Sequence, residues 1–232
     1  MSDNDLDALL AGVRVDPAVH ALRPDFAVFT AIVDGLPSGP SDASSAGLLS
    51  AAAATATGAQ DDPHLLAWRE AYRAFGAKPN RTRNSADALL RRADSGLPQV
   101  NRVVDLYNAS SVAHRLPVGG EDWDCYVGTP RLVRARGDEE FDTVRDGAPA
   151  TETPEPGEVV WADDAGVTCR RWNHRQCVRT RLREDSKRGF FLLERLEPMP
   201  LDTLAEIGAE LLDRLTAPAP EARVATRLIT GA

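Results

Sequence analysis

The chain has 232 residues, of which 43% are hydrophobic and 27% are charged, and its formal net charge is −8. This length and composition predict one large or two small globular domains, and no apolar run approaches the ~18–20 residues of a membrane-spanning helix. The three cysteines (Cys125, Cys169 and Cys177) are odd in number and include no CxxC pair, which argues against a disulfide framework and a structural zinc site. The acidic start, MSDNDLDALLAG, lacks the basic-then-apolar order of a secretory signal, so we expect a cytoplasmic protein.

Helical periodicity recurs along the chain. The clearest helix covers residues 62–76, because Asp61 or Asp62 can cap it and Pro63 suits its first turn. The Ala- and Ser-rich residues 43–58 predict either a helix or a partly ordered linker. The full set of predicted helices is 1–12, 43–58, 62–76, 85–94, 100–114 and 201–215.

Strand patterns alternate with these helices, so we expect a mixed α/β (α+β) fold. The clearest is a hairpin in which Val159–Ala162 and Val167–Trp172 flank four turn residues. If the second strand alternates regularly, Arg170 and Trp172 share one of its faces and Cys169 lies on the other. The other predicted strands are Phe26–Val33, Gly189–Leu196 and the short runs CYVG, RLVRAR and FDTVRDG after Asp124.

Basic charge gathers in two blocks of the sequence. Eight Lys or Arg residues stand against three acids in Arg69–Arg102, and eight stand against two in Cys169–Arg188. The two blocks carry a net charge of +11, which leaves −19 for the rest of the chain. Such blocks are typical of a nucleic-acid-binding surface that the total charge hides. The alternative is that arginine is simply the favoured surface cation of an Ala- and Arg-rich sequence.

The segment Pro98–Asp124 combines a helical pattern with a predicted break. Pro117 and the pair Gly119-Gly120 should end the helix. A buried helix that ends in a Gly-Gly turn can form a small polar pocket, because glycine lets a ligand approach the backbone N–H groups. Three acids follow this turn within four residues, and they either line such a pocket or solvate the turn: Glu121, Asp122 and Asp124.

Four sequence blocks carry a resemblance to a known family. They are AWREAYRAFGAKPNRTRNSADALLRR, PQVNRVVDLYN, LPVGGEDWD and VTCRRWNHRQCVRT. In this order they resemble the B3/B4 module of the bacterial phenylalanyl-tRNA synthetase beta chain, and more closely the free-standing B3/B4 proteins. The resemblance implies helices flanking a β-sandwich of unusual topology. We expect a B3/B4-like domain at 61–217, an N-terminal strand and helix segment at 1–60 within the same domain, and a loose tail at 218–232, with a Pro-rich loop at 147–158.

In the synthetase this module hydrolyses tRNA that carries a wrong, tyrosine-like amino acid. The resemblance therefore implies a stand-alone hydrolase that acts in trans on mischarged, phenylalanine-tRNA-like substrates. Its partner would be tRNA, with no DNA, membrane, cofactor or metal. The chain has no room for an adenylate-forming domain, so we do not expect it to charge tRNA. Two alternatives stay open: a non-catalytic module that binds tRNA or an amino-acid-like ligand, and a hydrolase of small esters or amides.

The resemblance also implies where the site lies. The family's pocket corresponds to the space between the helix Asn101–Val112, the segment Pro117–Asp124 and the hairpin Val167–Cys177. At the position of the synthetase's pocket histidine this chain has Gly119, and at that of its pocket glutamate it has Gln176 or Cys177. The two sites therefore differ in chemistry.

Hydrolysis of an activated ester needs a held water, donors for the oxyanion and a grip on the terminal adenosine. We expect the catalytic groups to be Asn108, Gly119, Gly120, Glu121 and Asp122, with backbone N–H groups as donors and an acid that orients water or binds the substrate's amino group. Expected substrate contacts are Trp172, Asn173, His174 and Gln176, although Trp172 is equally typical of a core. Expected RNA contacts are Arg81, Arg83, Arg170, Arg171, Arg175, Arg179 and Arg181.

Overall fold

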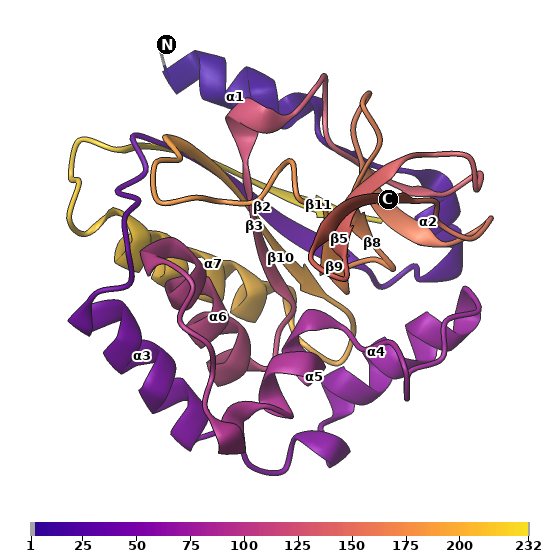
Figure 1. Cartoon of the computed structure of the whole chain (residues 1–232), viewed down its shortest axis with the longest axis horizontal. Coiled ribbons are helices and arrows are strands. Elements are labelled where there is room, and N and C mark those ends of the chain that lie inside the picture. The colour runs from indigo at the N-terminus through magenta and orange to yellow at the C-terminus, as the bar shows by residue number, and fades with distance from the viewer. Residues whose placement is uncertain (1–2, 232) are drawn as a thin grey trace.

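A four-stranded antiparallel sheet with the order β11–β2–β10–β3 lies at the centre of the fold (Figure 1). The fold comes from a computed structural model that describes residues 3–231. β2 and β10 are almost continuous apolar runs, as expected for strands that are covered on both faces. The strands of this sheet are β2 (Ala27–Asp34), β3 (Val118–Asp122), β10 (Arg188–Arg195) and β11 (Arg223–Thr230).

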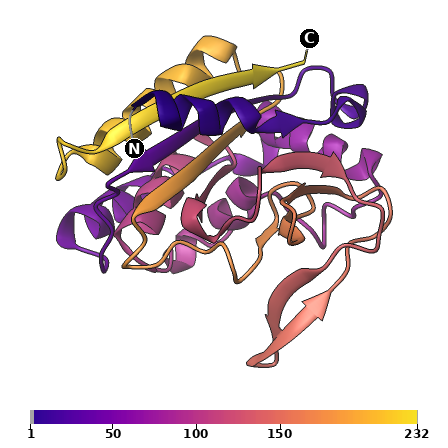
Figure 2. The same cartoon turned by 90° about the horizontal axis from the view of Figure 1, so that it is seen from above.

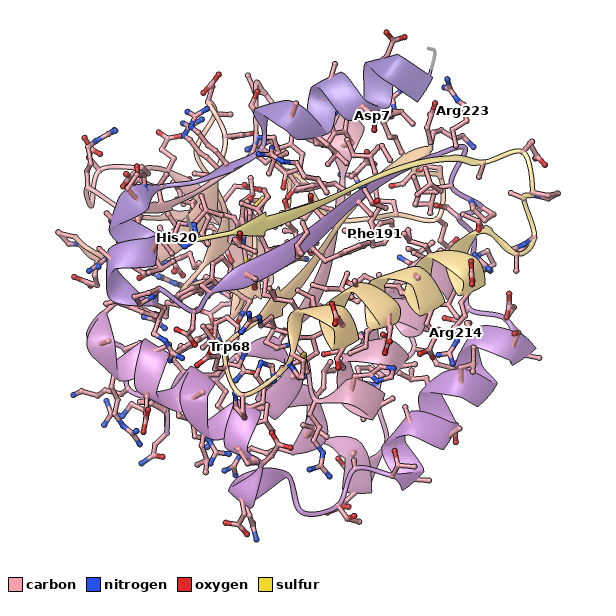
Figure 3. The ribbon with its side chains drawn as sticks, turned by 180° about the vertical axis from the view of Figure 1, so that it is seen from behind. Asp7, His20, Trp68, Phe191, Arg214 and Arg223 are labelled. Carbon is pink, nitrogen blue, oxygen red and sulfur yellow. The ribbon has the colours of Figure 1, made fainter. Side chains whose placement is uncertain are left out.

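Helices cover one face of the central sheet. Phe29 of β2 and Phe191 of β10 enter a core that they share with Leu106 and Leu211 from two of these helices. Figure 3 shows this side of the molecule, with Phe191 labelled between the strands and the long C-terminal helix. The covering helices are α3 (Ala43–Ala54), α6 (Arg102–His114) and α7 (Leu201–Thr216).

Local signals fix both ends of α6, which later supplies residues to the site. The Asn101 side chain accepts a hydrogen bond from the Val104 N–H at 2.9 Å and so caps the first turn. Val100, the first residue of the predicted helix 100–114, precedes this cap and is 55% exposed. The helix ends at His114, as predicted, because Arg115 takes a left-handed conformation with φ 52°.

A second sheet with the order β1–β4–β7–β8–β9 packs against the opposite face. Its core contains the fully buried Trp68, Trp161 and Trp172, and the rings of Trp68 and Trp172 meet edge to face with centroids 5.2 Å apart. The strands on this side are β1 (Arg14–Val15), β4 (Arg131–Arg134), β7 (Val159–Ala162), β8 (Val167–Arg170) and β9 (Arg175–Gln176). Three helices complete this layer: α1 (Asp3–Gly12), α2 (Pro17–Leu22) and α4 (Pro63–Ala74).

A two-stranded hairpin projects from the body of the molecule (Figure 2). It consists of β5 (Phe141–Arg145) and β6 (Ala148–Glu152). We expected residues 147–158 to form a loop, and this prediction was wrong for the part that pairs with β5. Glu152 at the end of β6 binds the side chains of Arg170 and Arg175, which fastens the hairpin to the second sheet.

The mixed α+β fold is confirmed, as are most of the predicted elements. The predicted hairpin is β7 and β8, joined by a four-residue turn. The Ala-rich segment is helix α3, which Asp42 caps through its bond from the Ser45 N–H at 2.8 Å. The run CYVG is not a strand. The remaining short elements are α5 (Ser85–Leu90) and the 3₁₀ turns η1 (Ala59–Asp61), η2 (Ala93–Ser95) and η3 (Trp123–Cys125).

The C-terminal segment 218–232, which we expected to be loose, contains strand β11, so that prediction was wrong. Its side chains alternate, with Ala225 and Ile229 buried against the sheet. The Arg227 guanidinium reaches the end of α1, where it donates to three main-chain carbonyl oxygens at 2.8–2.9 Å. Pairing with β2 and this cap hold the tail in place.

Candidate functional site

A cavity of about 420 Å³ opens where α5, α6, the central sheet and the tip of the β8–β9 hairpin meet. Segments far apart in the sequence contribute to its wall, which brings together most of the residues that the sequence singled out. From the catalytic set it includes Asn108, Gly119, Gly120 and Glu121, and from the substrate-binding set Trp172, Asn173, His174 and Gln176. Arg175 is the member of the expected RNA-binding set that lines it.

Gly119 forms the open part of the cavity floor. Gly119 and Gly120 both lie within β3, opposite β10, so the turn that we expected at these two glycines was wrong. A Cβ added to Gly119 would meet no atom within 4 Å, whereas one added to Gly120 would lie 2.8 Å from Leu182 Cδ1 and 2.9 Å from the Tyr107 ring. The two glycines therefore face opposite sides of the strand: Gly119 toward the cavity and Gly120 toward a packed core.

The two glycines give a direct test of this placement. We expect Gly120→Ala to lower the free energy of unfolding by about 1–3 kcal/mol because its methyl group overpacks the core. We expect Gly119→Ala to leave the free energy of unfolding within about 0.5 kcal/mol of the parent, since a surface-type change without new contacts has little effect. Urea denaturation of both variants measures the difference. Equal losses would contradict the assignment of Gly119 to an open floor.

Strand pairing limits which backbone amides can serve as oxyanion donors. The Glu194 N–H donates to the Pro117 carbonyl at 3.0 Å, and the Asp122 N–H donates away from β10, to the Thr180 carbonyl, at 2.8 Å. Along a strand of an antiparallel pair, successive backbone N–H groups point alternately toward and away from the partner strand. The Gly119 N–H therefore points toward β10 and is not presented to a ligand. The Gly119 N–H is therefore not the oxyanion donor that we expected.

Two buried glutamates face the cavity from neighbouring strands of the floor. Glu121 is 3% exposed and accepts a hydrogen bond from the Tyr126 hydroxyl. Glu194 is 2% exposed and accepts from Trp161 Nε1 at 2.8 Å and from Asn173 Nδ2 at 2.7 Å. Burial raises the pKa of each carboxyl group to about 7, and the charge of Glu121 adds to this effect on Glu194.

Glu194 was not predicted from the sequence. The available signal was a single acid within the apolar run GFFLLERL, since an acid at a buried strand position needs a reason. Its partner Asn173, which we expected to contact substrate, is held at both ends, because its Oδ1 accepts from the Tyr72 hydroxyl at 2.8 Å. Asn173 thus sets the position of the Glu194 carboxylate.

The backbone at the tip of the β8–β9 hairpin departs from regular strand geometry. Arg171 and Trp172 both take left-handed conformations, with φ 49° and 67°, so regular alternation ends at Arg170. Trp172 therefore lines the cavity together with Cys169. The prediction that Trp172 shares a face of the strand with Arg170 was wrong. The Trp172 indole is fully buried, so it is not an exposed platform for a base.

His174 has a defined tautomer. Its Nδ1 lies 2.7 Å from the Arg83 carbonyl oxygen, which can only accept, so Nδ1 carries the proton and Nε2 has a free lone pair. Burial lowers the pKa of His174, and the charges of Arg171 and Arg175 add to this effect. At neutral pH the ring is therefore uncharged, with a basic nitrogen that no residue of the described chain occupies.

Two of the expected RNA-contacting arginines are structural. Arg170 is 6% exposed and binds Glu158 through two bonds of 3.0 and 2.8 Å. Arg179 binds Asp163 at 2.8 and 2.9 Å. These bidentate pairs leave neither guanidinium for a phosphate, so both predictions are corrected.

Asp122 also belongs to the scaffold rather than to the cavity. It accepts from the Ser186 hydroxyl at 2.6 Å and from the Asp124 N–H at 3.0 Å, which caps η3. Its predicted catalytic role is therefore dropped.

The remaining arginines vary in accessibility. Arg81 and Arg171 line a surface depression of about 340 Å³ together with Lys78, next to the α4–α5 loop. Arg181 is exposed, and Arg83 is half-buried beside Asp87 at 3.7 Å. Arg92, which the sequence analysis did not select, is exposed and lines the mouth of the cavity.

Two further features bear on the type of site. Within residues 3–231 no group of three or more His, Cys, Asp or Glu side chains is arranged to hold a metal ion. None of the helices in this range is both long and apolar enough to cross a membrane.

Comparisons with known proteins add a family match. The model of the B3/4 domain matches residues 67–205. No curated protein matches the chain. Among solved structures, the chain is similar to an N-terminal fragment of the phenylalanyl-tRNA synthetase beta-subunit from Pyrococcus horikoshii, with 14% identity and a TM-score of 0.46 over 91% of this chain. The match covers 49% of that fragment, so the chain spans about half its length.

Proposed function

Because the chain belongs to the B3/4 domain family, we propose that it hydrolyses the ester bond of mischarged aminoacyl-tRNA as a stand-alone enzyme. Its substrate would be a phenylalanine-tRNA-like molecule that carries an aromatic or non-protein amino acid. The main support is the convergence of Asn108, Glu121 and His174 from three distant segments on one cavity. A volume of about 420 Å³ suits a small ligand such as an aminoacyl group.

His174 fits the role of general base in this reaction. Its free Nε2 would take a proton from a water molecule while the water oxygen attacks the ester carbonyl. The carbon–oxygen bond to the ribose then breaks, and the ribose oxygen leaves with the proton from His174. The products are a free amino acid and an uncharged tRNA. An aminoacyl ester is already activated, so positioning accounts for much of the required rate.

Asn108 and Gln176 fit the role of orienting the substrate. Asn108 lies on α6 at the cavity wall, and its side-chain amide offers donors for the carbonyl oxygen. Gln176 is fixed by a hydrogen bond from its Nε2 to the Gly120 carbonyl at 2.9 Å. This bond holds Gln176 against strand β3 at the edge of the cavity floor.

The mouth of the cavity carries positive charge suited to the acceptor end of tRNA. Arg92 stands at the mouth, Arg175 lies beside it in an ion pair with Glu152, and Arg81 and Lys78 extend the charge along the α4–α5 loop. Phosphate contacts of this kind set affinity and make it dependent on salt.

Incubation of the protein with a panel of mischarged tRNAs tests the proposed function. The panel should include tyrosine, tyrosine analogues and non-protein amino acids on phenylalanine tRNA. We expect the protein to hydrolyse the aminoacyl ester of at least one member and to leave correctly charged tRNA intact. No hydrolysis of any member would reject the proposal, and salt-sensitive retardation of tRNA without hydrolysis would favour a binding module instead.

A neighbouring pair of arginines tests the tRNA contact. We expect Arg92→Ala to reduce tRNA affinity about 5- to 10-fold and to lower the salt slope by about 1, because one phosphate contact is lost. Arg91→Ala is the matched control, since Arg91 is also exposed but pairs with Asp87 outside the cavity. Equal effects of the two substitutions on a salt titration of binding would contradict a specific contact by Arg92.

A further inference from the structure

Among the described residues four buried acids have no cationic partner, and two of these, Glu121 and Glu194, line the cavity. Among the described residues, Asp87, Glu158 and Asp163 form ion pairs with arginines. Glu121 and Glu194 form none, although both are at least 97% buried. The other buried acids, Asp105 and Asp122, accept main-chain and hydroxyl hydrogen bonds.

Glu121 and Glu194 lie on the same face of the floor. In the β3–β10 register Gly119 stands opposite Leu192, and both residues line the cavity. Glu121 lies two positions after Gly119 and Glu194 lies two positions after Leu192, so each acid is on the same face as the residue two before it. Because the strands are antiparallel, the two acids lie on opposite sides of the Gly119–Leu192 pair. The two carboxyl groups therefore flank the open floor above Gly119, and both line the cavity.

The two acids differ in how far their neighbours satisfy them. Glu194 accepts one hydrogen bond at each oxygen. Glu121 accepts from the Tyr126 hydroxyl, and Thr168, Thr180 and Gln176 also lie within reach of its carboxyl group. A carboxylate has about four acceptor positions, so Glu194 retains the larger capacity for a donor within the cavity.

The Trp172 indole limits what else the cavity presents to a ligand. Trp172 lines the cavity and is fully buried, and its Nε1–H has no hydrogen-bond partner among the described residues. Because this nitrogen is itself buried, it lies behind the cavity surface and is not offered to a ligand. The two acids thus determine the charge of the floor, a pattern that matches a cationic group.

We propose that Glu121 and Glu194 bind the protonated α-amino group of the aminoacyl substrate. This inference rests on the proposed function and names the feature that the site selects. The floor between the acids then admits a free ammonium group, whereas an acylated nitrogen is uncharged and keeps only one N–H donor. The protein therefore acts on aminoacyl-tRNA and spares peptidyl-tRNA and other N-acylated forms.

N-acetylation of a substrate tests this inference directly. We expect an N-acetyl-aminoacyl-tRNA to be hydrolysed about 10- to 100-fold more slowly than the same tRNA with a free amine, the size of effect expected when a charge-assisted hydrogen bond is lost. Glu194→Gln and Glu121→Gln should each reduce this discrimination. The exposed Glu206→Gln is the matched control and should keep it.

The outcome separates this inference from the proposed function. Equal hydrolysis of the free and acetylated forms would overturn the role of the acids and leave the hydrolase intact. If neither form is hydrolysed, binding of 3′-deoxy-3′-(L-tyrosylamino)adenosine and its N-acetyl derivative gives the answer. The amine form should bind about 10-fold more tightly or better, and equal binding would overturn the inference even where the protein lacks hydrolytic activity.

Discussion

Replacing His174 with alanine is expected to lower the deacylation rate constant by about 10²- to 10⁴-fold, the usual contribution of a general base. The structure gives the reason, since the Arg83 carbonyl fixes the Nδ1 proton and leaves Nε2 free at the cavity wall. The lowered pKa of His174 keeps this nitrogen unprotonated at neutral pH. Single-turnover hydrolysis of a mischarged tRNA measures the rate of the chemical step without product release.

Two matched variants separate catalysis from folding. His174→Asn retains a side-chain amide that can donate toward the Arg83 carbonyl but has no basic nitrogen, so it should be as slow as the alanine variant. His114→Ala, at the end of α6 and paired with Glu210, should keep the parent rate. A His174→Asn variant within about threefold of the parent would show that another group activates the water, because loss of a general base costs at least about 10².

The sequence predicted the helices well because their ends carry local chemistry. Asp62 caps α4 through the Leu65 N–H at 3.0 Å, and Pro63 occupies the first turn. The β7–β8 hairpin was predicted for the same reason, since its turn residues are adjacent in the sequence. Such signals act within a few residues and need no knowledge of the tertiary fold.

Features that depend on tertiary contacts were not predicted. The left-handed conformations of Arg171 and Trp172 bring the indole to the cavity side, and no local rule places two such residues together. Arg170 was assigned to RNA because its charge was visible in the sequence, whereas Glu158, its partner, lies 12 positions away. Strand β11 depends on pairing with β2, nearly 200 residues earlier. These errors arose where contacts beyond the local sequence decided the outcome.

The wall of the site is held by one chain of hydrogen bonds between the second-sheet layer and the central sheet. The Tyr72 hydroxyl of α4 donates to Asn173 at the hairpin tip, and Asn173 donates to Glu194 of β10. Trp161 of β7 donates to the other Glu194 oxygen. Because these bonds join elements from both sheets and from a helix, the Glu194 carboxylate is positioned before any ligand arrives. This arrangement favours binding without rearrangement of the cavity.

The same buried acids should make stability fall as pH rises. Their carboxyl groups have a pKa of about 7 in the folded chain, against a reference value of 4.5. Between these values the folded state keeps protons that the unfolded state has lost, so the free energy of unfolding decreases with increasing pH. From about pH 5.5 to about pH 8 we expect a loss of about 2 kcal/mol for each acid. Burial lowers the pKa of His64 below 6.5, so this histidine acts in the opposite direction, with stability gained as pH rises toward 6.5.

Comparison with glutamine variants isolates the contribution of each acid. Glu194→Gln and Glu121→Gln remove one titrating group each, so each variant should lose about 2 kcal/mol less than the parent over this range. The histidine contribution is common to all the proteins and cancels in the difference. Glu206→Gln, which removes an exposed acid, should follow the parent curve. Urea denaturation at several pH values measures these curves, and a Glu194→Gln curve parallel to that of the parent would mean that Glu194 is already ionised in the folded protein. An ionised Glu194 would then need a cation beside it in the cavity throughout this pH range, because an unpaired buried charge is strongly destabilising.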